Sequence, residues 1–126
     1  MSNPHKGRTG IDRVLHASRY SVDGLRTAYR EESAFRQEFW LSTIMLPASL
    51  WLGQSWAERA LLAGSVLLVL ITELLNSGIE AVVDRVSMDI HELSKRAKDY
   101  GSAAVMLSLL LCSGVWLSAI VSRVSG

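Results

Sequence analysis

Four polar side chains recur at helical spacing in a stretch that is otherwise apolar. Glu73, Asn76, Glu80 and Asp84 fall within about an 80° arc of an α-helix, because each residue advances the helix by about 100°. An acidic residue at the centre of a membrane helix costs about 2.5–3.5 kcal/mol on the translocon scale. Such a stripe indicates a catalytic or ion-handling site. The alternative is an ordinary polar seam between helices, which more often uses Ser, Thr or a single Asn.

The residue types around this stripe favour oxygen-based chemistry. The sequence contains no phosphate-binding glycine motif and no His-Glu-x-x-His motif, and its one cysteine, Cys112, lies in an apolar run. Carboxylates suit a hard divalent cation, and Mg²⁺ commonly accompanies nucleotide phosphates. Together with the basic residues between 95 and 98, they form the minimal set for phosphoryl transfer. Glu73, the deeper carboxylate, could accept a proton from a hydroxyl presented within the bilayer.

Three apolar segments of this 126-residue chain are long enough to cross a bilayer. No charged residue occurs from 39 to 57 or from 100 to 122, and residues 60–83 are interrupted only by Glu73 and Glu80. Segments of about 20 residues match a hydrocarbon core of about 30 Å. We therefore expect a single all-α membrane domain over residues 1–126. Its transmembrane helices are expected at about 38–56, 59–84 and 99–122.

The basic residues predict the orientation of these spans and a further helix before them. Seven precede the first span and four lie between the second and third, so the N-terminus and second loop are expected to be cytoplasmic. Residues 1–10 are expected to fray. Apolar residues from Ile11 to Tyr29 recur at three- and four-residue steps, which predicts an amphipathic surface helix over residues 11–36. The alternative for this segment is a simple juxtamembrane anchor.

Two long motifs resemble those of the prokaryotic diacylglycerol kinase family. The first is Glu73-x-x-Asn76-Ser77-Gly78-Ile79-Glu80-Ala81-Val82-Val83-Asp84-Arg85. The second runs from His91 to Val105 and includes Lys98-Asp99-x-Gly101-Ser102-Ala103-Ala104. Upstream, the matching segments are Glu32-x-Ala34-Phe35-Arg36-Gln37-Glu38, Tyr20-Ser21 and Gly24-Leu25-Arg26. The resemblance covers nearly the whole chain in the right order.

The resemblance implies a homotrimeric kinase of the bacterial inner membrane. It would transfer the γ-phosphate of ATP to diacylglycerol, give phosphatidic acid and use Mg²⁺, with no nucleic-acid partner. Its active sites would form between subunits, with Glu73 as proton acceptor beside Asn76, and Glu32 and Glu80 as magnesium ligands. The implied nucleotide-binding residues are Arg13, Tyr20, Glu32, Glu80, Asp89, Ile90, His91, Lys98 and Asp99. The implied lipid-substrate residues are Arg13, Arg26, Ala34, Phe35, Arg36, Gln37, Glu38, Trp51, Arg59, Glu73 and Ser102.

Departures from the family pattern are mild. Glu31 stands where Asn is usual, Gly78 where Ala is common and Asp89 where Glu is common, and none of these changes removes a catalytic group. Structural alternatives also exist for single residues. Asp84 could pair with Arg85 or cap a helix, His91-Glu92 could form a solvated turn, Lys95 and Arg96 could bind anionic headgroups, and Tyr20 could be an interfacial anchor.

Two other function classes compete with diacylglycerol phosphorylation, besides the same chemistry on another lipid alcohol such as undecaprenol. A small proton or cation transporter would use Glu73 and Glu80 as a relay. The cluster of Glu32, Lys98 and Asp99 argues against it, because a relay needs no nucleotide cradle and residues 60–72 offer no continuation to the outer face. A structural membrane adaptor leaves the acidic residues unexplained. The sequence does not determine which lipid alcohol is preferred.

Overall fold

The computed structural model describes residues 9–86 and 91–126, which form four α-helices and no strand. The helices are α1 (Gly10–Glu31), α2 (Ser33–Leu52), α3 (Trp56–Val86) and α4 (Glu92–Ser125). The prediction of an all-α chain is confirmed. The charged segment before residue 99 continues directly into the apolar part of α4, so that both belong to one helix of 34 residues.

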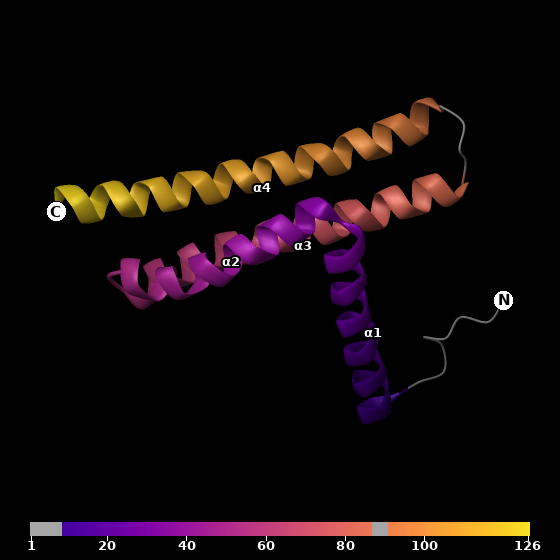
Figure 1. Ribbon diagram of the computed structural model, residues 1–126, viewed down its shortest axis with the longest axis horizontal. Helices are drawn as coiled ribbons and strands as arrows, with labels where there is room; N and C mark the ends of the chain where they lie inside the picture. The colour runs from indigo at the N-terminus through magenta and orange to yellow at the C-terminus, as the bar shows by residue number, and fades with distance from the viewer. Residues whose placement is uncertain (1–8, 87–90) are drawn as a thin grey trace.

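α3 and α4 lie antiparallel and side by side, and this is the most extensive contact between any two helices (Figure 1). α2 packs along the N-terminal half of α3. α1 contacts mainly α2 and projects sideways from the other three helices (Figure 1). The junction of α1 and α2 therefore lies beside the middle of α3, the part of that helix that carries the polar stripe.

A single extended residue separates α1 from α2. Glu32 has φ −113° and ψ 107°, and its N–H still donates to the carbonyl oxygen of Ala28 at 2.8 Å. The Arg36 guanidinium fixes the bend, because Nη1 donates to the carbonyl oxygens of Tyr29 (2.8 Å) and Arg30 (3.2 Å). The surface helix was expected to continue to residue 36. It ends at Glu31, so Ala34, Phe35 and Arg36 lie on α2 instead.

α3 and α4 are the two helices in the described ranges that are long and apolar enough to cross a membrane. In the most apolar window of each, only 17% of the residues are buried inside the chain. Large side chains such as Leu75, Leu107 and Leu110 are more than half exposed. A helix that is apolar on all sides needs lipid or another protein around it. These helices therefore indicate a membrane protein.

Hydrogen bonds made by side chains set the register of α3 against α4. The hydroxyls of Thr72 and Ser108 lie 2.8 Å apart. Nearer the loop between α2 and α3, the Trp116 indole Nε1 donates to the carbonyl oxygen of Leu62 at 3.2 Å. Leu62 is fully buried, in a small apolar cluster with Leu52 and Ala119. Sliding one helix along the other would break these bonds, so they fix which residues face each other farther along.

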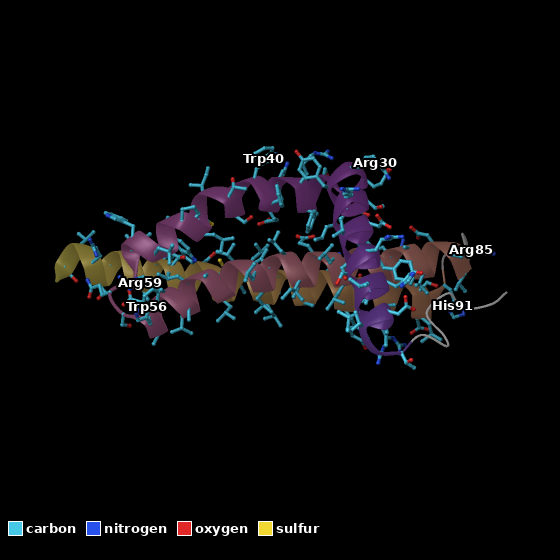
Figure 2. The ribbon with its side chains drawn as sticks, turned by 90° about the horizontal axis from the view of Figure 1, so that it is seen from below. Arg30, Trp40, Trp56, Arg59, Arg85 and His91 are labelled. Atoms are coloured by element: carbon cyan, nitrogen blue, oxygen red, sulfur yellow. The ribbon has the colours of Figure 1, made fainter. Side chains whose placement is uncertain are left out.

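Arg59 closes the loop between α2 and α3. Its Nε donates to the carbonyl oxygens of Leu50 and Gly53, both at 3.1 Å, and its guanidinium lies 4.8 Å from the centre of the Trp56 ring. A side chain at Gly53 would overlap Arg59, so the close approach requires glycine there. Figure 2 shows Arg59 and Trp56 at the opposite end of the molecule from Arg85 and His91.

Candidate active site

Four carboxylates converge where the junction of α1 and α2 meets α3. Glu73 lies in the middle of α3 and is buried, with 7% of its surface exposed. Glu38, Glu80 and Glu32 all lie within electrostatic range of its carboxylate. They come from the first turns of α2, from two turns farther along α3 and from the break between α1 and α2. Crowded like charges repel one another, and this repulsion favours a bound cation.

Asn76 connects two of the predicted site residues. It lies one turn after Glu73, and its amide Nδ2 donates to Oε1 of Glu80 at 3.4 Å. Its amide oxygen is buried, with no hydrogen-bond partner among the described residues. The structure therefore places Glu73, Asn76 and Glu80 on one face of α3, as the helical spacing predicted.

Lys98 on α4 provides a cation beside this acidic face. Its Nζ lies 2.8 Å from Oδ1 of Asp84, across the contact between α3 and α4. The hydrogen bond to Asp84 raises the pKa of the Lys98 ammonium group, and the charge of Asp84 adds to this effect. Lys98 thus stays cationic at neutral pH. The ion pair of Asp84 joins two helices, whereas the structural alternative paired it with the adjacent Arg85.

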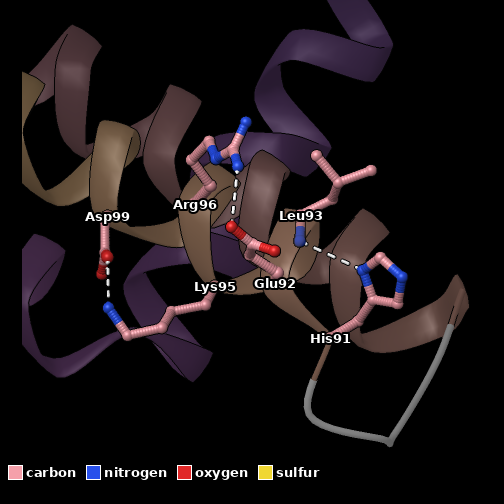
Figure 3. A network of polar contacts seen from close by, with 6 residues as sticks. All are labelled: His91, Glu92, Leu93, Lys95, Arg96 and Asp99. Carbon is pink, nitrogen blue, oxygen red and sulfur yellow. Dashed lines mark hydrogen bonds and ion pairs between the residues drawn. The ribbon is translucent and has the colours of Figure 1, made fainter.

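The first turns of α4 hold three local polar contacts (Figure 3). His91 caps the helix, because its Nδ1 accepts the N–H of Leu93 at 3.1 Å. Lys95 Nζ lies 2.7 Å from Asp99 Oδ2, and this hydrogen bond raises the pKa of Lys95. Arg96 pairs with Glu92 at 3.0 Å. Asp89 and Ile90, two of the implied nucleotide-binding residues, lie outside the described residues.

Of the implied site residues on α1, Arg13 lies away from this cluster within one chain. Arg13 and Arg26 are exposed, and Tyr20 is half-buried. At a rise of about 1.5 Å per residue, Arg13 lies about 27 Å along α1 from Glu31. The structure thus brings the acidic residues of α2 and α3 together, but it does not bring Arg13 to them.

The implied lipid-contact residues fall into two groups at different depths. Arg26 and Phe35 line a groove of about 800 Å³ at the junction of α1 and α2, while Ala34 and Gln37 are exposed on α2. Trp51 and Arg59 lie at the far end of the bundle. Arg59 is about 21 Å from Glu73 along α3. Ser102 is exposed on α4, one turn beyond Lys98.

An apolar cavity of about 360 Å³ opens between α2, α3 and α4. Glu38 lies on its wall, and the remainder is mostly apolar, including Leu41, Val69, Cys112 and Trp116. Glu38 is also the carboxylate with the strongest electrostatic effect on Glu73. The cavity therefore approaches the acidic cluster from the apolar side. The cavity could not be predicted from the sequence, because its walls come from three helices whose register only the structure shows.

Magnesium fits the donor chemistry of this site, although one chain supplies few ligands. Glu32 and Glu80 both offer carboxylate oxygens, the donors that Mg²⁺ prefers. In residues 9–86 and 91–126 no group of three or more His, Cys, Asp or Glu side chains is placed to hold a metal ion. Mg²⁺ usually keeps several waters and binds substrate phosphates together with one or two carboxylates. Two carboxylates would therefore suffice when nucleotide is bound.

Comparisons with known proteins show the family of this chain. Residues 19–120 match a family model described as prokaryotic diacylglycerol kinase. A diacylglycerol kinase of Pseudomonas aeruginosa is 47% identical over 119 residues, which cover 94% of this chain and 97% of that relative. The diacylglycerol kinases of Haemophilus influenzae and Escherichia coli are 45% and 47% identical over 108 residues. These alignments cover 86% of this chain and 92% and 88% of the two relatives.

Proposed function

The chain belongs to the prokaryotic diacylglycerol kinase family, and we propose that it transfers the γ-phosphate of ATP to the free hydroxyl of diacylglycerol. The products are phosphatidic acid and ADP. The observation that carries this proposal is the buried Glu73, which lies among three further carboxylates beside an apolar cavity. A base at the boundary between a charged cluster and an apolar space suits a reaction between a charged nucleotide and a lipid.

Glu73 is the proposed general base. It takes the proton of the lipid hydroxyl while the hydroxyl oxygen forms a bond to the γ-phosphorus. The bond between that phosphorus and the oxygen bridging to the β-phosphate breaks, and ADP leaves. Asn76 lies one helical turn away and donates its amide to Glu80, so it lies between the proposed base and a proposed magnesium ligand. General-base catalysis of this kind contributes about 10²–10⁴-fold to the rate.

The proposed nucleotide site lies at the charged end of α3 and α4. Lys98 supplies a positive charge for phosphate, and the side chains of His91 and Asp99 lie in the same turns of α4. Glu32 and Glu80 are the proposed magnesium ligands. A bound Mg²⁺ would neutralise negative charge on the transferred phosphate group.

We further propose that α2, α3 and α4 cross the bacterial inner membrane and that α1 lies on its cytoplasmic face. The distribution of basic residues supports a cytoplasmic N-terminus. On α1, Ile11, Val14 and Leu15 are each more than 60% exposed. An amphipathic surface helix places such residues at the boundary between headgroups and acyl chains. The first two turns of α2 contain Arg36, Gln37 and Glu38, which fit the headgroup region better than the hydrocarbon core.

The substrate lipid would approach the base from the apolar side. The cavity between α2, α3 and α4 is lined by apolar groups and carries Glu38 on its wall. The groove at the junction of α1 and α2 adds aromatic surface from Tyr29, Phe35 and Phe39 and the cation of Arg26. Both spaces suit acyl chains that enter from the bilayer while the hydroxyl group remains near Glu73.

The working assembly is proposed to be a homotrimer whose sites lie between subunits. One chain leaves Arg13 about 27 Å along α1 from the acidic cluster, and the apolar surfaces of α3 and α4 are mostly uncovered. Mixed trimers test the shared site. A Glu32→Ala chain assembled with a differently tagged Glu73→Gln chain should recover activity that neither has alone. Activity no higher than that of either parent would place each site in one subunit.

Direct phosphorylation tests the substrate. The purified protein in a lipidic phase receives ATP labelled at the γ-phosphate and, in parallel, diacylglycerol, monoacylglycerol, ceramide or undecaprenol. We expect the label to appear in phosphatidic acid, with dependence on Mg²⁺. Faster labelling of undecaprenol would assign the same chemistry to that lipid alcohol. No labelled lipid, together with proton flux in proteoliposomes that Glu73→Gln abolishes, would favour the transporter.

A further inference from the structure

Gly101 on α4 lies directly against Asn76 on α3. Gly101 is buried, and a Cβ built on it would overlap the amide oxygen of Asn76 and lie 3.2 Å from its Cγ. Three other glycines in α3 and α4, at positions 64, 78 and 114, have no neighbouring atom within 4 Å of the same point. Glycine is a poor helix former. Of these four helical glycines, Gly101 is thus the one whose missing side chain makes room for a neighbour.

The neighbour that fills this space belongs to the proposed active site. The buried amide oxygen of Asn76 has no hydrogen-bond partner among the described residues, so no hydrogen bond to that oxygen fixes the orientation of the amide. The amide nitrogen faces the other way and donates to Glu80 at 3.4 Å. This bond is long and weak. Contact with the backbone of α4 at Gly101 is therefore well placed to determine where the amide points.

We propose that Gly101 is a positioning residue for phosphoryl transfer, because its lack of a side chain lets Asn76 lie against α4 and point its amide nitrogen at Glu80. This inference rests on the proposed kinase function. A side chain at position 101 would push either the amide or the whole of α4 away, and both movements would weaken the bond between Asn76 and Glu80. A displacement of about 1 Å in an active site can cost about 100-fold in rate.

The test compares two glycine substitutions in the same helix. Gly101→Ala should lower kcat about ten- to hundredfold and change the KM for ATP less than kcat, because the added methyl group meets Asn76 rather than the nucleotide residues of α4. Gly114→Ala adds the same methyl group to α4 where nothing lies nearby, and it should leave kcat within about twofold. An unchanged kcat in Gly101→Ala, measured beside an active Gly114→Ala protein, would overturn the proposal.

A second measurement shows whether Asn76 is the group that is displaced. Gly101→Ala should lower the unfolding temperature of the purified protein, and adding Asn76→Ala should remove that loss because no amide oxygen remains to be displaced. In the Asn76→Ala background, Gly101→Ala should also cause no further loss of kcat. Equal losses of stability in both backgrounds would overturn the role of the contact. If Gly101→Ala alone does not assemble, recovery of assembly in the double variant supports the contact, and no recovery overturns it.

The controls separate this inference from the function on which it rests. Wild-type protein without lipid kinase activity would overturn the proposed function and, with it, the catalytic role of Gly101. Wild-type and Gly114→Ala proteins that are both active, beside an unimpaired Gly101→Ala protein, would overturn the inference alone. The unfolding measurement needs no substrate and therefore reports on the contact in either case.

Discussion

The two ends of the helical bundle use charged residues in opposite ways. At the end with the loop between α2 and α3, Arg59 binds backbone carbonyls and stacks on Trp56, and Arg123 lies 4.8 Å from the ring of Trp51. Each of these cations meets a carbonyl dipole or an aromatic face. Near the junction of α1 and α2, in contrast, Glu32, Glu38 and Glu80 surround a buried carboxylate.

This difference separates a structural end from the proposed reactive end. At the structural end, carbonyl oxygens and aromatic rings of the same chain already contact each cation, so that nothing further needs to bind. Gathered carboxylates repel one another, and the repulsion is relieved when a cation or a positively charged partner arrives. Charged residues thus stabilise the structure at one end and form the proposed binding site at the other. Substitutions at the two ends should therefore have effects of different kinds.

The largest effect is expected for Glu73→Gln. Amide in place of carboxylate keeps the shape but removes the base, so kcat should fall about 10²–10⁴-fold while assembly and ATP binding are kept. Glu58→Gln makes the same change at the other end of α3 and should leave kcat within about twofold. The assay is labelled phosphate transfer to diacylglycerol, with ATP binding measured separately. Activity of Glu73→Gln within a few-fold of wild type would remove Glu73 from the mechanism.

Glu32→Ala and Glu80→Ala should each raise the Mg²⁺ concentration needed for the half-maximal rate. Loss of an outer-shell partner alone commonly costs about 10–100-fold in metal affinity, and loss of a direct ligand should cost at least as much. Because the proposal assigns one ion to both residues, the double variant should be little worse than the worse single variant. A combined loss equal to the product of the two single losses would show that the residues act independently.

Lys98→Gln should raise the KM for ATP about 10–100-fold, because a hydrogen bond to a charged group is worth about 1.5–3 kcal/mol. Arg96→Gln is the matched control. It removes a cation two residues away whose partner, Glu92, lies in the same helix. Its KM for ATP should stay within about threefold of wild type. Equal effects of the two substitutions would indicate that general positive charge on α4, rather than Lys98 itself, attracts the nucleotide.

The effect of Lys98→Gln should not depend on pH across the usual assay range. Asp84 raises the pKa of Lys98 above its ordinary value of 10.5. Lys98 is therefore charged throughout the usual assay range, and it loses its charge only as the pH rises through the higher folded-state pKa. The ratio of wild-type to variant kcat/KM for ATP should thus be the same at pH 6.5 and pH 8.5. A ratio that decreases from pH 6.5 to pH 8.5 would contradict this titration.

The smallest effect is expected at the structural end. Arg123→Gln removes the contact with Trp51, and a cation–π contact at an exposed site is worth about 0.5–1 kcal/mol. The unfolding temperature should fall slightly, while kcat and the KM for ATP stay within about twofold of wild type. A large loss of activity without a loss of stability would show that this end also takes part in catalysis.

Sequence reasoning predicted the apolar helices and the polar stripe well, because both depend on local periodicity. α3 and α4 contain the segments expected at 59–84 and 99–122, and Glu73, Asn76 and Glu80 share one face as their spacing required. The first transmembrane helix was predicted at about 38–56. α2 covers most of that range, but its first turns include Arg36 and Glu38, and it is not among the described helices that are long and apolar enough to cross a membrane. Its crossing of the membrane stays a prediction.

The break at Glu32 and the partner of Asn76 could not be read from local patterns. No glycine or proline marks the end of α1, and the bend depends on Arg36 reaching back to the carbonyls of Tyr29 and Arg30. The contact between Gly101 and Asn76 depends on the register of α4 against α3. Contacts of this kind join residues far apart in sequence, and only the packed helices bring them together.

The unbroken length of α4 has a consequence for the depth at which the two substrates meet. Its 34 residues span about 51 Å, against about 30 Å for a hydrocarbon core, so about 20 Å of the helix would lie in headgroups or water when α4 crosses the membrane as proposed. Because α4 is one continuous helix, it fixes the distance along its axis between Lys98 and the apolar cavity. A thicker bilayer would bring more of α4 into the hydrocarbon core, and a thinner bilayer would favour tilting of the helix. In the proposed kinase, membrane thickness would thereby set the depth of the nucleotide site and the cavity together, while the helix keeps the distance between them constant.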